Sequence, residues 1–317
     1  MISVVLPTFN GSRYVREAIA SVLAQTHQAL ELIVVDDGST DDTPSILASY
    51  ADSRMRVIRH PQNAGLPTAL NTGFASAIGD FVTWTSDDNY YVPEALEVMA
   101  AHALASQSDC VYTDYFECAP GGPPRLVSLP PRFDPKSGVT LGACFLYARA
   151  VMTEVGAYDP DTVPAEDYDY WLRIAARYSI AHINQPLYYY RLHPQSLTAQ
   201  TAASYAPRIM NILLRLRYGH LSASQARTGL LLMLATRRLE RRPIAVLIHR
   251  ASSGWLWRRL VRLCSLARRP HDGPLVDSIL AQFLDGGASC QQTLAAIQSL
   301  APEAPASSQV PPSQPGS

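Results

Sequence analysis

Short apolar runs alternate with segments of helical periodicity through the first half of the chain, and this alternation restricts the fold more than any other feature. Strands are predicted near 2–6, 31–35, 55–59 and 80–84, and helices near 12–25, 43–50, 66–77 and 92–104. Strands separated by helices pair in parallel through right-handed crossovers. The pattern therefore predicts an α/β fold with a mostly parallel, Rossmann-like sheet flanked by helices.

The second half of the chain changes character. Further strands are predicted at 109–116, 140–147, 180–183 and 187–190. From about residue 202 the pattern is helical only, and the residues from 301 onward are rich in Pro, Ser, Ala and Gln. With 317 residues, 47% of them hydrophobic, the chain is long enough for one α/β domain and a smaller helical unit.

Pairs of acidic residues stand just past the ends of predicted strands. Asp36 and Asp37 follow the apolar run 32–35. Asp87 and Asp88 come after the fourth predicted strand. The carboxyl ends of parallel strands open on one crevice, where such sheets bind ligands. Carboxylates gathered there repel one another unless a cation or a donor-rich ligand joins them, so the pattern indicates a divalent metal ion that holds a phosphate ester.

Several segments, taken in order, resemble the signature of family 2 glycosyltransferases. They are residues 4–10 (Val-Val-Leu-Pro-Thr-Phe-Asn), 21–26 (Ser-Val-Leu-Ala-Gln-Thr), 31–41, 63–65, 69–73, 85–89, 166–169 and 190–193. A diacid after a strand is common by itself, but the ordered series is specific, and it covers about residues 2–200. The resemblance implies a GT-A-like fold and an inverting transferase that depends on a nucleotide sugar.

The resemblance also predicts how the chain is divided into domains. Residues 1–200 are expected to form the nucleotide-sugar-binding GT-A-like catalytic domain. Residues 201–300 form a helical carboxy-terminal extension, and residues 301–317 a disordered tail.

Cysteine usage and hydropathy predict the compartment. The five cysteines show no CxxC spacing and are odd in number, which argues against a disulfide framework or a zinc site. Residues 2–6 are already strand-like, which leaves no room for a signal peptide, and no apolar run has the length of a membrane span. We therefore expect the protein in the cytoplasm.

Charge is distributed unevenly along the chain although the formal net charge is only −1. Residues 205–270 hold fourteen arginines against one acid, Glu240. Between 237 and 269 these arginines alternate with Trp255, Trp257 and leucines, which is typical of peripheral contact with an anionic membrane. A solvated arginine-rich helical surface explains the pattern equally well. Nothing besides charge favours nucleic acid, and none is expected as a partner.

The resemblance places the nucleobase contact on Asp37. A carboxylate can accept the imide N–H of uracil or thymine, and backbone atoms around Pro7, Thr8 and Phe9 would complete the base pocket. The structural alternative is that Asp36 and Asp37 only cap their own loop. That alternative stays open for Asp36.

Asp87 and Asp88 stand where the family has its Asp-x-Asp metal motif. This chain departs from the commoner form because Thr85 replaces the first acid. One carboxylate would bind the metal and the other the donor's ribose or a water, with Asp88 the first choice for the metal. A manganese or magnesium ion (Mn2+ or Mg2+) would be completed by the diphosphate and water. The alternative is a turn that caps a helix near Pro93.

A third acidic pair is Glu166-Asp167. The resemblance assigns the general base to Asp167, the second acid of this pair. One carboxylate at the pocket mouth is enough to deprotonate an acceptor hydroxyl in a one-step inversion. Glu166 would help to orient the donor, and Gly142 would let the acceptor-side loop approach the sugar. The alternative is that the pair only complements the positive end of a helix.

Two residues after the last predicted strand complete the site. His193 corresponds to a histidine that reaches the metal or the diphosphate in many enzymes of this fold, although a lone histidine is often structural. Arg191 is an alternative phosphate contact, since a guanidinium group binds phosphate oxygens in a bidentate manner.

The sequence thus predicts a transferase that moves a sugar from a UDP- or dTDP-linked donor to a hydroxyl of a glycan or lipid-linked acceptor, as in synthesis of cell-envelope polysaccharide. Two alternatives remain at this stage. The acceptor could be a protein or a polyprenyl phosphate, or the chain could bind nucleotide sugars without turnover, for which Thr85 is the argument.

Overall fold

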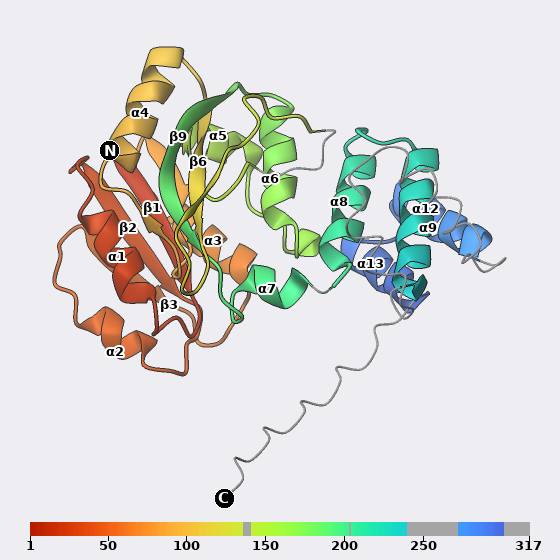
Figure 1. The fold of residues 1–317 in the computed structure, drawn as a ribbon, viewed down its shortest axis with the longest axis horizontal. Helices are drawn as coiled ribbons and strands as arrows, with labels where there is room; N and C mark the ends of the chain where they lie inside the picture. Colours follow the sequence, from red (N-terminus) through yellow and green to blue (C-terminus); the bar gives the residue numbers. More distant parts are fainter. Residues whose placement is uncertain (136–140, 203, 240–271, 301–317) are drawn as a thin grey trace, which may run out of the picture.

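The computed structural model describes residues 1–135, 141–202, 204–239 and 272–300, and Figure 1 shows their arrangement. Within these residues the centre is a nine-stranded sheet of order β3-β2-β1-β4-β8-β6-β9-β5, with β7 paired to β6. The strands are β1 Ile2–Thr8, β2 Leu30–Asp36, β3 Met55–Arg59, β4 Phe81–Trp84, β5 Tyr90–Tyr91, β6 Cys110–Cys118, β7 Arg125–Val127, β8 Phe145–Ala148 and β9 Ile180–Arg191. The predicted α/β fold is confirmed.

The first four long strands form a parallel half-sheet, as predicted. In the register of β1 with β2, Thr8 stands opposite Asp36, and in the register of β1 with β4, Val5 stands opposite Trp84. The carboxyl ends of these strands therefore open on one edge of the sheet. That edge is where the first two acidic pairs are found.

The second half of the sheet is mixed. Strand β8 runs antiparallel to both β4 and β6, whereas β6 and β9 are parallel. The sequence predicted two strands, 180–183 and 187–190, but the structure has the single strand β9. Its pairing with β6 shifts register around Asp114, so the Asn-Gln-Pro segment 184–186 is accommodated as an irregularity and not as a turn.

Helices cover both faces of the sheet. They are α1 Val15–Leu23, α2 Thr43–Ala48, α3 Leu66–Ala75, α4 Ala95–Ser106, α5 Arg149–Val155, the 3₁₀ helix η1 Pro160–Thr162, and α6 Glu166–Ala175. Val4 and Leu6 of β1 pack in one core with α1 and α4, whereas Val5 packs in a second core with α3, α5 and α6. Burial on both faces explains why these strands are continuously apolar.

The remaining helices form a group beside the sheet. They are α7 Leu197–Ala202, α8 Ala206–Arg217, α9 Ala223–Leu239, α12 Asp272–Leu284 and α13 Cys290–Ser299. Tyr168 and Leu172 of α6 share a core with α8, α9, α12 and α13, and Figure 1 shows α6 facing this group. The domain boundary near residue 200 stays a prediction.

Two predictions concern parts of the chain that the structure does not describe. Most of the arginine-rich segment 237–269 and the whole tail 301–317 lie outside the described residues. Membrane contact by that segment therefore stays a prediction. Among the described helices, none combines the length and the apolar character that a membrane crossing requires.

Gln25 is a buried amide that joins α1 to α4. Its Nε2 donates to the carbonyl oxygens of Ser21 (3.0 Å) and Val92 (2.7 Å), and its Oε1 accepts the N–H of Leu96 (2.9 Å). Because Leu96 lies in the first turn of α4, this bond satisfies one of the N–H groups that a helix start leaves unpaired.

We predict that Gln25→Leu lowers the free energy of unfolding by about 1–3 kcal/mol, since the buried N–H of Leu96 loses its partner. Urea denaturation would measure the change. Gln282→Leu on the exposed surface of α12 is the matched control and should stay within about 0.5 kcal/mol of the parent. Equal stability of the two variants would contradict the assignment.

Candidate active site

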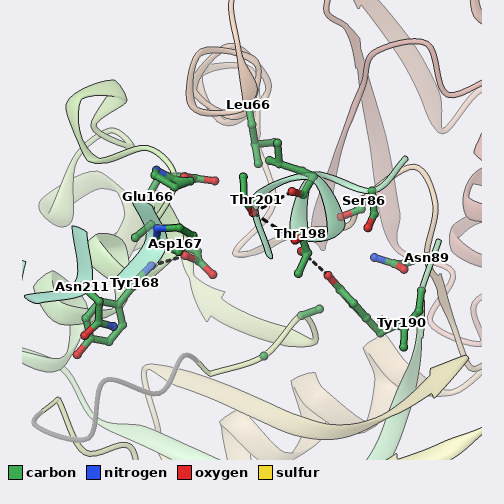
Figure 2. Close-up of a pocket in the computed structure, with 18 of the residues that line it drawn as sticks. Leu66, Ser86, Asn89, Glu166, Asp167, Tyr168, Tyr190, Thr198, Thr201 and Asn211 are labelled. Carbon is green, nitrogen blue, oxygen red and sulfur yellow. Dashed lines mark hydrogen bonds between the residues drawn. The ribbon is translucent and has the colours of Figure 1, made fainter. Parts of the chain in front are cut away.

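A pocket of about 940 Å³ lies between the edge of the sheet and the helices α6, α7 and α8. Figure 2 shows Glu166 and Asp167 on one side of this cavity, Ser86 and Asn89 on the other, and the hydroxyls of α7 between them. Four of the predicted residues line it, namely Asp88, Gly142, Glu166 and Asp167. The pocket thus contains acids from two of the three pairs, which are far apart in the sequence.

Asp87 is held against the end of β1. The hydroxyl of Thr8 donates to Oδ2 of Asp87 at 2.5 Å. A Cβ on Gly11 would lie 2.0 Å from the same oxygen, so a side chain there would displace the carboxylate of Asp87. Burial, together with the negative charge of Asp88, raises the pKa of Asp87 to about 7, against the hydrogen bond from Thr8 that lowers it. Gly11 was not predicted as a site residue, and its only signal in the sequence is its place directly after the segment 4–10.

Asp88 lies beside His193, the other residue that is predicted to reach the metal or the diphosphate. Nε2 of His193 lies 2.9 Å from Oδ2 of Asp88, and the histidine ring packs against Tyr14 with 5.0 Å between centroids. Oδ1 of Asp88 is buried and has no hydrogen-bond partner. An orphaned carboxylate oxygen beside an imidazole suits a divalent cation whose remaining ligands come from phosphate oxygens.

The described residues contain no cluster of three or more His, Cys, Asp or Glu side chains that could hold a metal alone. That the donor's diphosphate would supply further ligands stays a prediction.

Arg191 lies beside the same loop. Its backbone N–H donates to Oδ1 of Asn89 at 2.7 Å, and its Nη2 donates to Glu17 at 2.6 Å. The guanidinium group lies over the rings of Tyr14 (4.3 Å) and Tyr90 (5.4 Å). Nη1 is buried without a hydrogen-bond partner. The geometry leaves one N–H edge of Arg191 for an anion.

Asp37 is buried, and its carboxylate already accepts several hydrogen bonds from the protein. Its carboxylate accepts the N–H groups of Ala64 (3.0 Å) and Gly65 (2.9 Å), and Nδ1 of His60 lies 2.6 Å from Oδ1. Nε2 of His60 in turn lies 2.9 Å from the hydroxyl of Thr72 on α3. Asp37 therefore ties the loop before α3 to β2. Its nucleobase contact stays a prediction, and His60 was not foreseen.

The other residues of the predicted base pocket are close by in the sheet. Pro7 is buried in β1, opposite Val35, and Phe9 directly after β1 is 46% exposed. Asp36 accepts the N–H of Ser39 at 2.9 Å, which is the loop-capping role that the sequence left open for it. Neither Pro7 nor Phe9 lines the pocket described above.

Glu166 and Asp167 form the first turn of α6. The backbone N–H of Tyr168 donates to Oδ1 of Asp167 at 2.6 Å, while Oε2 of Glu166 is buried without a hydrogen-bond partner. Burial raises the pKa of Asp167, and burial with the charge of Asp167 raises the pKa of Glu166 to about 7. A carboxylate with a raised pKa at a pocket wall is suited to accept a proton near neutral pH.

Gly142 lies on the segment before β8 with φ of 75°, a left-handed conformation that favours glycine. A Cβ there would lie 2.9 Å from Leu129 and 3.2 Å from Tyr115. Gly142 is thus closely surrounded by other side chains and lines the pocket, while its approach to the sugar stays a prediction.

Residues 3–147 match the family model described as glycosyl transferase family 2. An uncharacterised glycosyltransferase of Rickettsia prowazekii is 30% identical over 212 residues, which cover 62% of this chain and 66% of that protein. A glycosyltransferase of Rickettsia felis is 30% identical over 189 residues, 55% of this chain and 31% of that protein. EpsJ of Bacillus subtilis is 28% identical over 222 residues, 62% of this chain and 63% of that protein. The chain spans less than two thirds of the length of each of these relatives.

Solved structures show the same fold. TarS 1–349 of S. aureus in complex with UDP-GlcNAc has a TM-score of 0.57 at 18% identity, and the alignment covers 94% of this chain and 90% of that one. The mannosyltransferase PcManGT of Pyrobaculum calidifontis, in complex with GDP-Man and Mn2+, has a TM-score of 0.56 at 16% identity, with 94% and 86% covered. The predicted GT-A-like fold is confirmed, and residues 3–147 are identified as a glycosyl transferase family 2 domain.

Proposed function

We propose that this chain is a metal-assisted inverting glycosyltransferase that moves a sugar from a nucleotide-diphosphate donor, UDP- or dTDP-linked, to a hydroxyl of a glycan or lipid-linked acceptor. The observation that carries the proposal is that Asp88, Glu166 and Asp167 line one and the same pocket. Complexes of TarS with UDP-GlcNAc and of PcManGT with GDP-Man and Mn2+ support the class of donor and the metal.

Asp88 and His193 would hold the metal, with Asp87 beside them. A bound Mn2+ or Mg2+ would neutralise the charge that develops on the diphosphate as the glycosidic bond breaks. Arg191 would direct its unpaired Nη1 to a phosphate oxygen. Of these residues Asp88 lines the pocket, and in this proposal all four would face the donor.

Asp167 would act on the acceptor side. Its carboxylate takes the proton of the acceptor hydroxyl as that oxygen attacks the anomeric carbon. The bond from the anomeric carbon to the diphosphate oxygen breaks, and its electron pair leaves with the nucleoside diphosphate. The hydroxyls of Thr198 and Thr201 on α7 line the same pocket and suit a polyhydroxylated acceptor.

Metal-dependent hydrolysis of the donor, with water as acceptor, tests the proposal. We predict slow release of UDP from UDP-GlcNAc in Mn2+, loss of release in chelator, and loss in Asp88→Ala, because the orphaned carboxylate is removed. Asp285→Ala, an exposed acid after α12, is the control and should match the parent. Full activity in chelator would overturn metal assistance. Binding of donors without any release would favour a protein that binds nucleotide sugars without turnover.

Removal of the proposed base gives a second prediction. Asp167→Asn keeps the shape of the side chain but cannot take a proton, so kcat should fall by roughly 10²–10⁴ while the KM for the donor changes little. Steady-state kinetics would measure both. If donor binding were lost and kcat kept, Asp167 would be a donor ligand instead. Unchanged transfer to an acceptor that is already an anion, such as a polyprenyl phosphate, would favour that alternative acceptor.

Glu166→Gln gives a prediction for stability. The pKa of Glu166 is about 7 in the folded chain against an ordinary 4.5, so the unfolded chain loses this proton first as pH rises. The carboxylate therefore costs the folded state stability progressively between pH 4.5 and 7 and by a constant amount above pH 7. Glutamine carries no charge, so the variant should gain stability over the parent across this window, by on the order of 3 kcal/mol at pH 8.

Urea denaturation at pH 5 and pH 8 in chelator measures this gain. Glu94→Gln, exposed before α4, is the control and should show no pH-dependent difference. A gain for Glu166→Gln that is the same at both pH values would rule out the ionisation of Glu166 as its cause.

A further inference from the structure

The loop that leads into α6 is bonded to the start of α13, more than a hundred residues later in the chain. Oδ2 of Asp161 accepts the N–H of Cys290 at 2.7 Å, and Oδ1 accepts the N–H of Gln291 at 3.1 Å. These donors belong to the first turn of α13, whose positive end favours a carboxylate. Asp161 therefore caps the amino-terminal end of α13 although it belongs to a different part of the chain.

The side chain of Gln291 also bonds to the loop that contains Asp161. Its Nε2 donates to the carbonyl oxygens of Asp161 (3.2 Å) and Val163 (2.5 Å). Val163 stands three residues before Glu166, where α6 begins. The side chain of Gln291 thus fixes the backbone of the loop just before the two acids that line the pocket.

Helix α8 adds a second attachment to the same region. Arg217 lies near Asp159 (3.7 Å) and Asp161 (3.6 Å), and the hydroxyl of Tyr218 donates to Oδ1 of Asp169 at 2.7 Å. The other oxygen of Asp169 accepts from Arg173 at 2.9 Å. The carboxylate of Asp169 is thus held from α6 itself and from the end of α8. Figure 1 shows α13 beside α8, so both attachments come from the same group of helices.

We propose that the carboxy-terminal helices position the catalytic acids, and that Gln291 is a positioning residue for Asp167. The inference rests on the proposed role of Asp167 as the base. A general base must lie within hydrogen-bonding reach of the proton that it takes, and a displacement of about 1 Å lowers the rate steeply. Ala165, the residue before α6, has no side chain that could cap this helix, so the contacts from α13 and α8 contribute to fixing the position of the first turn.

The test compares Gln291→Leu, which removes the donating amide at similar size, with Gln298→Leu on the same helix as control. Hydrolysis of UDP-GlcNAc in Mn2+ and hydrogen–deuterium exchange of residues 163–169 are measured on the full chain. For Gln291→Leu we expect kcat to fall at least tenfold, the KM for the donor to stay within twofold, and exchange of 163–169 to rise. Gln298→Leu should match the parent in all three.

A double-mutant cycle separates positioning from general damage to the fold. If Gln291 acts through Asp167, Gln291→Leu should lower kcat no further in an Asp167→Asn background. The inference would be overturned if the fold losses in kcat of the two variants multiplied in the double variant. It would also be overturned if Gln291→Leu folded and kept the parent's kcat and hydrogen–deuterium exchange. If Gln291→Leu fails to fold, Gln291→Asn, which keeps the amide but shortens its reach, is held to the same criteria. Full turnover by Asp167→Asn alone would overturn the proposed function, and this inference with it.

Discussion

Carboxylates held away from water, close to one another, are the constraint on which the rest of this structure depends. Burial raises the pKa of Asp87 and of Glu166 to about 7, and each has a second acid as its neighbour in the chain. A fold that places such groups together loses stability in the absence of a ligand, because both desolvation and repulsion oppose their ionisation. In the proposed function a cation and the hydroxyls of the substrates would remove that penalty on binding. The cost in the free protein would then be recovered when the charged donor binds.

Two separate parts of the fold hold the two acidic pairs that contribute to the pocket. The parallel register of β1, β2 and β4 brings Asp87 and Asp88 to the carboxyl edge of the sheet, where Thr8 and the absence of a side chain at Gly11 set their approach. The other pair depends on α6, whose outer side packs on the carboxy-terminal helices. The helical extension is therefore joined to the site by packing and hydrogen bonds, and not only by the chain.

Local sequence patterns predicted the frame well because its elements carry their own hydrophobic periodicity. The strands up to 84, the acidic pairs past their ends and the start of α6 all lie close to where the pattern placed them. The resemblance to the family placed Asp88 and His193 each near the metal, and the structure brings the two side chains within 2.9 Å of each other. The interruption within β9 was misjudged, because a bulge depends on the partner strand and leaves no distinct mark in the sequence.

The sequence by itself determined the fold class, the edge of the sheet at which two of the acidic pairs lie and most of the acids that line the pocket. These features follow from hydrophobic periodicity, strand ends and short motifs, which are local properties of the chain. Only the tertiary structure decided how those acids are partnered. Asp37 takes up the N–H groups of Ala64 and Gly65, and Gln291 reaches the loop before α6 from the far end of the chain. Such contacts join residues with no pattern in common, since a hydrogen bond requires only that two groups meet in space with the right geometry.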